Sequence, residues 1–280
     1  MTGMYVLGIC DRGADRDAVK RAVDRTVDCL ERRGRVGVVS YDATIADGQA
    51  IHESNVVGGD VSYELGADGD WAASGTGLNV ANALDRLAVE CEYAVVTGIS
   101  DLRYPTVLIG DRASDHSDDD VLAAVDAPGD LDVDAVADAL EETEPHRTLE
   151  SLVARVKRSP NADRSGAIAT FTGRVRAKDD PDDARTEYLE FEKYEGVADE
   201  RMAALEADLE EREGVLEVEL HHRTGVVRDG EDIVFVVVLA GHRTEAFRTV
   251  EDGINRLKDE VPLFKKEVTV DDEFWVHERT

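Results

Sequence analysis

The sequence is poor in cysteine and lacks any long apolar run. Its three cysteines, Cys10, Cys29 and Cys91, are widely spaced and predict neither a disulfide framework nor a metal site. No stretch approaches the roughly 18 apolar residues of a membrane-spanning helix. Residues 1–8 show no basic segment followed by an apolar one, which a secretory signal would require. We therefore expect a soluble protein of the cytoplasm.

Positive charge is also scarce. The chain has 32 Lys and Arg against 62 Asp and Glu, a formal net charge of -30 and a pI near 4.5. This balance argues against general binding to nucleic acids or anionic membranes, since both require a basic face. Such self-repulsion destabilises a compact state unless salt screens it. We interpret the composition as halophilic, adapted to a cytoplasm with molar salt, and the alternative is an acidic protein of a mesophile.

The length and the charge distribution predict two domains. A chain of 280 residues with 42% hydrophobic content can form two ordinary cores. Residues 111–144 contain thirteen Asp and Glu against one Arg, which is typical of a solvated acidic face or a flexible linker. We place the boundary at the end of this acidic tail, giving domains of residues 1–145 and 146–280.

The first domain is predicted to be an α/β layer domain with a mainly parallel sheet. An apolar run at residues 4–9, a helical apolar pattern at 15–33 and a second strand at 36–41 form a βαβ unit. Two further helices and two further strands are predicted from the remaining apolar patterns: helices at 78–87 and 133–140, strands at 93–97 and 106–109.

The first turn of this domain has the two glycines of a phosphate-binding P-loop, Gly8 and Gly13, at the right separation. A P-loop also needs Lys and Ser or Thr, but here Ala14 and Asp15 stand in those places, so a structural turn is the preferred interpretation. This loop and residues 91–105 resemble the GTP-binding MobB family. The resemblance covers about residues 1–110 and implies a P-loop-like fold with a degenerate loop.

The second domain is predicted to be α+β. Residues 188–194 and 216–220 alternate as half-buried strands do, and residues 166–172 and 233–240 are rich in β-forming residues. Helical apolar patterns lie near 149–156, at 202–209 and at 246–261, where Pro262 ends the last helix. Strands able to pair through hairpins, with helices inserted among them, indicate this fold class.

A stretch near the end of the chain departs from the general acidity. Residues 242–267 hold six Lys and Arg and six Asp and Glu, so they are formally neutral, which suggests an anionic ligand. His242 and Arg243 open the last helix, where N–H groups and the helix dipole favour anions. Lys258 follows fifteen residues after Arg243, so about 22 Å separates them along the helix.

That distance leaves three interpretations. Lys258 and Lys265 of one subunit could share a ligand with His242 and Arg243 of a partner, as a homodimer would allow. The two groups could instead perform separate tasks, or they could be ordinary solvated cations on a helix.

Several motifs of this domain resemble the catalytic subunit of molybdopterin synthase, MoaE. They are residues 171–176 (FTGRVR), His242-Arg243, residues 258–267 (KDEVPLFKKE) and Trp275-Val276, in the family's order and spacing over about residues 148–280. The resemblance implies a MoaE-like, α/β-hammerhead fold. It also implies an enzyme that converts cyclic pyranopterin monophosphate to molybdopterin.

The resemblance further implies the partner and the site residues. Sulfur would come from the C-terminal Gly-Gly thiocarboxylate of a small ubiquitin-like MoaD-like protein, in a heterotetramer built on a catalytic homodimer. Lys258 and Lys265 match the family's catalytic lysines, and Arg176, His242 and Arg243 match its substrate-binding residues. No cofactor is expected. The alternatives are a non-catalytic adaptor and a GTP-binding MobB-type protein of the same pathway.

Overall fold

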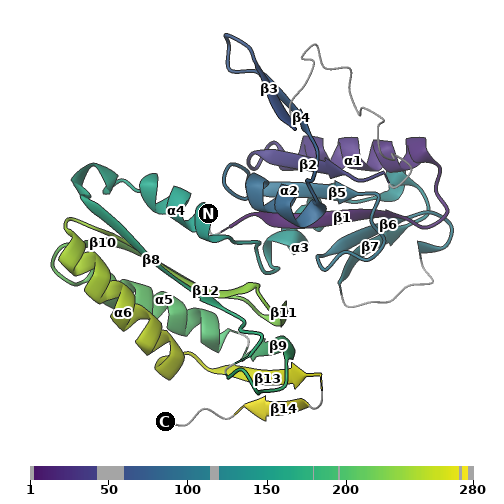
Figure 1. Cartoon of the computed structure of the whole chain (residues 1–280). Helices are drawn as coiled ribbons and strands as arrows, with labels where there is room; N and C mark the ends of the chain where they lie inside the picture. The colour runs from purple at the N-terminus through teal and green to yellow at the C-terminus, as the bar shows by residue number, and fades with distance from the viewer. Residues whose placement is uncertain are drawn as a thin grey trace. The chain divides into compact units, whose positions relative to one another are not determined.

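The computed structural model of the chain describes residues 3–42, 60–113, 120–178, 180–194, 196–270 and 273–276 (Figure 1). The chain forms two compact units, Met1–Thr148 and Leu149–Thr280. Among the described residues, no helix is long and apolar enough to cross a membrane.

The first unit is built on a five-stranded parallel sheet in the order β2-β5-β1-β6-β7. Its strands are β1 (Tyr5–Asp11), β2 (Val36–Ser40), β5 (Tyr93–Thr97), β6 (Thr106–Ile109) and β7 (Val121–Val125). Helices α1 (Arg16–Leu30), α2 (Val80–Leu87) and α3 (Val133–Glu141) carry the apolar stripes that the sequence predicted. The side chains of α1 and α3 form one apolar cluster with the sheet, and those of α2 form a second one.

Two features of this unit differ from the interpretation of the sequence. A hairpin of β3 (Val61–Leu65) and β4 (Trp71–Gly75) forms a separate two-stranded sheet. The acidic stretch contains β7, the short 3-10 helix η2 (Pro128–Asp130) and α3, so its interpretation as a flexible linker is wrong for these residues. Leu140 of α3 is fully buried while neighbouring carboxylates face solvent, and the stretch therefore supplies an acidic face.

The turn after β1 places a carboxylate where a P-loop would hold a phosphate. The Oδ1 atom of Asp11 accepts hydrogen bonds from the backbone N–H groups of Gly13 and Ala14, both at 2.7 Å. Asp15 caps α1 by accepting a bond of 2.6 Å from the N–H of Ala18. Gly13 has a φ of +104°, which favours glycine. The backbone N–H groups of Gly13, Ala14 and Ala18 are thus hydrogen-bonded by the chain's own side chains.

The second unit contains two antiparallel sheets. One has the order β10-β12-β8 and the other the order β11-β9-β13-β14. Their strands are β8 (Ala167–Arg174), β9 (Thr186–Lys193), β10 (Val215–His222), β11 (Gly225–Arg228), β12 (Asp232–Ala240), β13 (Leu263–Thr269) and β14 (Glu273–Val276). Besides the 3-10 helix η3 (Ala162–Arg164), the helices are α4 (Leu149–Lys157), α5 (Val197–Glu210) and α6 (Arg243–Glu260).

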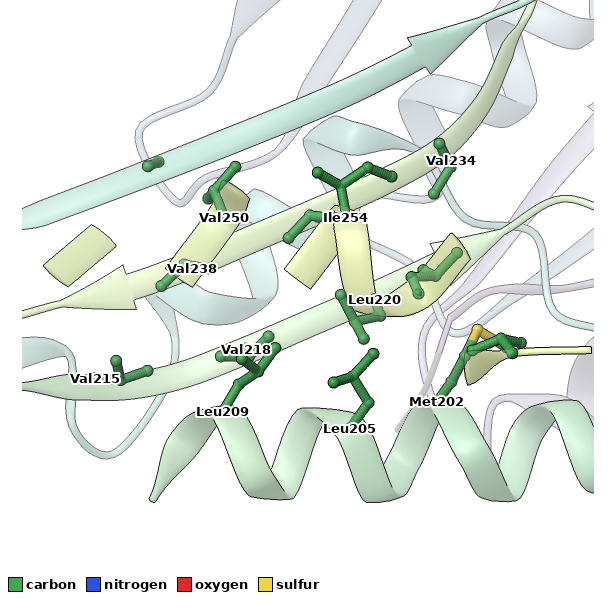
Figure 2. Close-up of a cluster of buried hydrophobic side chains, with 14 of the residues drawn as sticks. Met202, Leu205, Leu209, Val215, Val218, Leu220, Val234, Val238, Val250 and Ile254 are labelled. Atoms are coloured by element: carbon green, nitrogen blue, oxygen red, sulfur yellow. The ribbon is translucent and has the colours of Figure 1, made fainter. Parts of the chain in front are cut away.

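The main core of this unit lies between the three-stranded sheet and helices α5 and α6. Leu205 and Leu209 of α5 point toward Val218 and Leu220 of β10, as Figure 2 shows. Helix α6 covers β12 and β8, and α4 packs against the opposite face of the sheet. Side chains on both faces of β12 are therefore covered by helices, which explains why the strand is buried along nearly its whole length.

Candidate functional site

The two ends of α6 carry the cationic residues that the sequence singled out. His242 is the N-cap of α6 in an extended conformation, without a side-chain capping bond, and Arg243 is the first residue of the helix. Both side chains are exposed. Lys258 is exposed in the last turn, fifteen residues and about 22 Å away along the axis. A single copy of the chain therefore keeps the two groups apart on this helix.

The far end of α6 leads directly into the strand that carries Lys265. Val261 ends the helix and is buried, Pro262 prevents its continuation, and β13 begins at the next residue. Within β13, Lys265 lies opposite Phe191 of β9 on one side and Val276 of β14 on the other. The chain thus positions both lysines at the same end of α6.

A small apolar cluster connects Lys265 with Arg176. It comprises the buried residues Val175, Leu189, Phe191 and Val227, with Ile233 packed against it. Phe191 is the strand partner of Lys265, and Val175 directly precedes Arg176. Lys265 is half-buried and Arg176 is exposed two residues after β8 ends. Lys265 and Arg176 therefore each adjoin a member of this cluster, Lys265 through strand pairing and Arg176 through the chain itself.

Two of these cations have no counter-charge. Among the described residues, Arg243 and Lys258 form no ion pair, although this helix holds several acidic residues. Arg256, by contrast, pairs with Asp208 and with Glu260. In a chain of net charge -30, cations that remain unpaired are available to an anionic ligand.

A buried histidine, which the sequence patterns did not assign to this site, lies behind Phe191. The ring of His222 meets that of Phe191 edge to face at a centroid distance of 4.7 Å. Burial lowers the pKa of His222 to about 4, so the ring is neutral at pH 7. Its Nδ1–H donates to the backbone oxygen of Arg223 at 2.8 Å, as in a hydrogen-bonded structural histidine. His222 therefore packs against the ring of Phe191 and helps to hold it in place.

The second unit has two further histidines, His221 and His277. His221 is buried and stacks on Phe235 at 6.1 Å, and His277 lies outside the described residues. Within the described ranges, no group of three or more His, Cys, Asp and Glu could hold a metal ion.

The second unit is thus an α+β domain that presents cations at both ends of one helix, an arrangement suited to anionic ligands. The MoaE protein family matches residues 142–260. The probable molybdopterin synthase of Haloferax volcanii is 50% identical over 277 residues, covering 99% of this chain and all of that protein. The molybdopterin synthase catalytic subunit of Bacillus subtilis is 35% identical over 40% of this chain and 70% of its own length.

Solved structures resemble each half of the chain. Molybdopterin synthase from Staphylococcus aureus shares 32% identity at a TM-score of 0.39, covering 41% of this chain and 83% of that one. A MobB protein homolog from Bacillus stearothermophilus shares 15% identity at a TM-score of 0.37, covering 50% of this chain and all of that one.

The full-length similarity to the Haloferax protein decides the family. The chain belongs to the molybdopterin synthase family, which is a family of enzymes. The family, the enzyme class and the two-domain fold class predicted from the sequence are therefore confirmed.

Proposed function

We propose that the second unit installs the dithiolene sulfurs of molybdopterin on cyclic pyranopterin monophosphate. The sulfur donor is the C-terminal thiocarboxylate of a small ubiquitin-like protein with a Gly-Gly tail. The feature that supports this proposal is the position of Lys258 and Lys265 at the same end of α6, with Lys265 paired to Phe191 in a cluster that also contains Val175, the neighbour of Arg176. Both the substrate phosphate and the donor thiocarboxylate are anions, so a cationic site suits both of them.

The distribution of cysteine supports an external sulfur donor. All three cysteines lie in the first unit, and none follows Cys91. The second unit therefore has no thiol that could carry a persulfide, and sulfur has to arrive on a partner. The thiocarboxylate sulfur displaces an oxygen substituent of the pyranopterin and so forms a thioester between carrier and substrate, which water cleaves to leave a thiol on the substrate and a carboxylate on the carrier. The lysines can hold the anionic tail and move protons during these steps.

Arg176 of one copy and the His242-Arg243 pair of a second copy are assigned to the substrate anion, as the homodimer implied by the family resemblance would allow. A guanidinium offers a planar fork of donors that matches a phosphate, which a lysine does not. The N-terminal end of α6 adds backbone N–H groups and the positive end of the helix dipole to Arg243.

Purified chain, thiocarboxylated carrier and cyclic pyranopterin monophosphate together test the proposal, with molybdopterin as the product measured. Lys258→Ala and Lys265→Ala should each lower turnover by about 100-fold or more, the range for loss of a group that transfers protons. Arg176→Ala should instead raise KM about tenfold or more, as expected when a charge-assisted hydrogen bond to the substrate is lost.

Two neighbouring cations provide matched controls. Lys266 follows Lys265 on the opposite face of β13 and pairs with Glu273 at 2.9 Å, so Lys266→Ala should retain turnover. Lys178 lies near Arg176 and bonds to the backbone of Pro181, so Lys178→Ala should retain KM. Normal turnover in both Lys258→Ala and Lys265→Ala would refute the catalytic assignment. Absence of product with the unmodified chain, despite carrier binding, would favour the adaptor.

A further inference from the structure

Strand β10 forms one edge of the β10-β12-β8 sheet, and within the described residues its outer side pairs with no other strand. Helix α5 packs on one face of this strand and α4 on the other, and all side chains of residues 218–222 are buried. Folded proteins commonly protect an exposed edge with charged side chains, prolines or bulges. Residues 218–222 have neither a proline nor a charge that faces solvent, so protection of this edge has to come from elsewhere.

Helix α5 supplies two carboxylates to the edge of β10. The Oε1 atom of Glu206 accepts a hydrogen bond of 2.7 Å from the backbone N–H of Leu220. The Oε1 atom of Glu210 accepts a bond of 2.9 Å from the backbone N–H of Val218. In an antiparallel strand, N–H groups two residues apart point to the same side, and the N–H of Glu219 between them points to the opposite side, toward β12. The two carboxylates therefore occupy the outer side of β10, where another strand would otherwise pair.

The spacing of the helix matches the spacing of the strand. Residues four apart lie on one side of a helix, about 6 Å apart along its axis. N–H groups two residues apart on a strand are separated by about 6.8 Å. Leu205 and Leu209 directly precede the two glutamates and point into the core toward β10 (Figure 2). One step further around the helix, Glu206 and Glu210 lie over the edge of the strand, so α5 covers the core and the edge together.

The start of the same strand is protected in a different way. The pairing of β10 with β12 is irregular between Val215 and Glu217, and the N–H of Val215 donates to the backbone oxygen of Arg212 at 3.1 Å. A bulge disrupts the ladder locally and bends the strand, which discourages further pairing. The bulge and the two glutamates thus protect neighbouring parts of one edge.

Net charge alone does not protect this edge at high salt. The charge of -30 repels a second copy when salt is low. At about 1 M salt the Debye length is only about 3 Å, so the repulsion between two copies is screened beyond the range of a hydrogen bond. An N–H group that already donates to a carboxylate, by contrast, is not available to a second strand.

We propose that Glu206 and Glu210 form an edge cap, a contact built into the fold that prevents β10 from pairing with the β10 strand of a second copy. Without the edge cap, the N–H groups of Val218 and Leu220 become available, and two β10 edges can pair antiparallel about a two-fold axis. The edge cap is independent of the function proposed above, because none of the cations assigned there contributes to it.

The edge cap is tested with two double variants of the full-length chain that lose the same two charges. Glu206→Ala with Glu210→Ala removes both acceptors, whereas Glu206→Gln with Glu210→Gln keeps a carbonyl oxygen at each position. Light scattering after size exclusion in molar KCl measures the molar mass across a dilution series. In the alanine variant it should rise with concentration to at least about twice that of the unmodified chain. The glutamine variant should match the unmodified chain, as should the control Glu200→Ala with Glu211→Ala, which alters two exposed residues at the ends of α5.

Amide hydrogen exchange identifies the groups that pair. At low protein concentration, the N–H groups of Val218 and Leu220 should exchange about tenfold or more faster in the alanine variant than in the unmodified chain. The N–H of Glu219, which faces β12, should exchange at an unchanged rate. At high concentration the two exposed groups should regain protection, because they then pair with a second copy. Far-UV circular dichroism should be unchanged, because neither glutamate belongs to the apolar core.

Several outcomes would overturn the edge cap. A molar mass of the alanine variant that does not depend on concentration would show that β10 needs no such protection. Equal association of the glutamine variant would assign the effect to the lost charge, and association with a reduced helical signal would assign it to unfolding of α5. Unchanged exchange at Val218 and Leu220 in the alanine variant would show that the two carboxylates do not protect these groups.

Discussion

His222 is the residue whose ionisation should affect the stability of the second unit most clearly. Its folded-state pKa is about 4, below the ordinary 6.5, because burial penalises the charged ring. Between these values the unfolded chain binds more protons than the folded one, so stability falls as pH falls. The free energy of unfolding should fall by about 2 kcal/mol between pH 7.5 and pH 5. Above pH 7 this residue should contribute no pH dependence.

The measurement requires a signal from the second unit alone. The chain has two tryptophans, Trp71 in the first unit and Trp275 in the second, so Trp71→Phe leaves Trp275 as the reporter. Urea unfolding of this variant at pH 7.5 and at pH 5 gives the change in the free energy of unfolding of the second unit. His222→Gln in the same background removes the titrating group, and its stability should change less over this range. An equal loss in both chains would assign the pH dependence to other groups.

At the scale of elements, periodic apolar patterns predicted the helices and the central strands well. Helices α1 and α6 agree with their predicted ranges within a few residues at each end, because caps and Pro262 mark their limits. Strands β13 and β14 were missed as strands, since residues such as Lys265 and Lys266 give no apolar alternation. Pairing with β9 decides their conformation, and pairing between distant segments is not written in a local pattern.

The candidate site, too, could be predicted only in part from local sequence patterns. The sequence supplied Arg176, Lys258 and Lys265 through motif spacing, whereas the Phe191 cluster, which adjoins Lys265 and Arg176, arises from the pairing of distant strands. The role of His222 was not predictable, because its ring contact with Phe191 joins strands of two different sheets.

The turn after β1 leads to a prediction about the first unit. Its two loop amides already bind Asp11, and neither the lysine nor the hydroxyl residue of a P-loop is present. Calorimetric titration of the full chain with GTP and Mg²⁺ should therefore show no binding at this loop. A signal that Asp11→Asn strengthens, by removing the competing negative charge, would contradict this expectation and restore the GTP-binding alternative.

At the scale of the whole molecule, the dominant property is the net charge of -30. The acidic side chains repel one another throughout, and this repulsion weakens as the Debye length falls from about 10 Å at 0.1 M salt to about 3 Å at 1 M. The folded state is compact and the unfolded chain is expanded, so screening should stabilise the folded state more. Halophilic adaptation remains a prediction from composition, and the salt dependence of unfolding is its direct test.

Raising KCl from about 0.1 M to about 1 M should increase the unfolding free energy by about 3 kcal/mol and Tm by several degrees. Differential scanning calorimetry at both concentrations checks this, with an excluded non-ionic solute such as sucrose as the control. Sucrose strengthens burial without screening charge, so it should stabilise the chain less than KCl does. If stability were independent of KCl, the acidic surface would not require screening, and the mesophilic interpretation would be preferred. An equal effect of sucrose would assign the stabilisation to solute exclusion instead of charge.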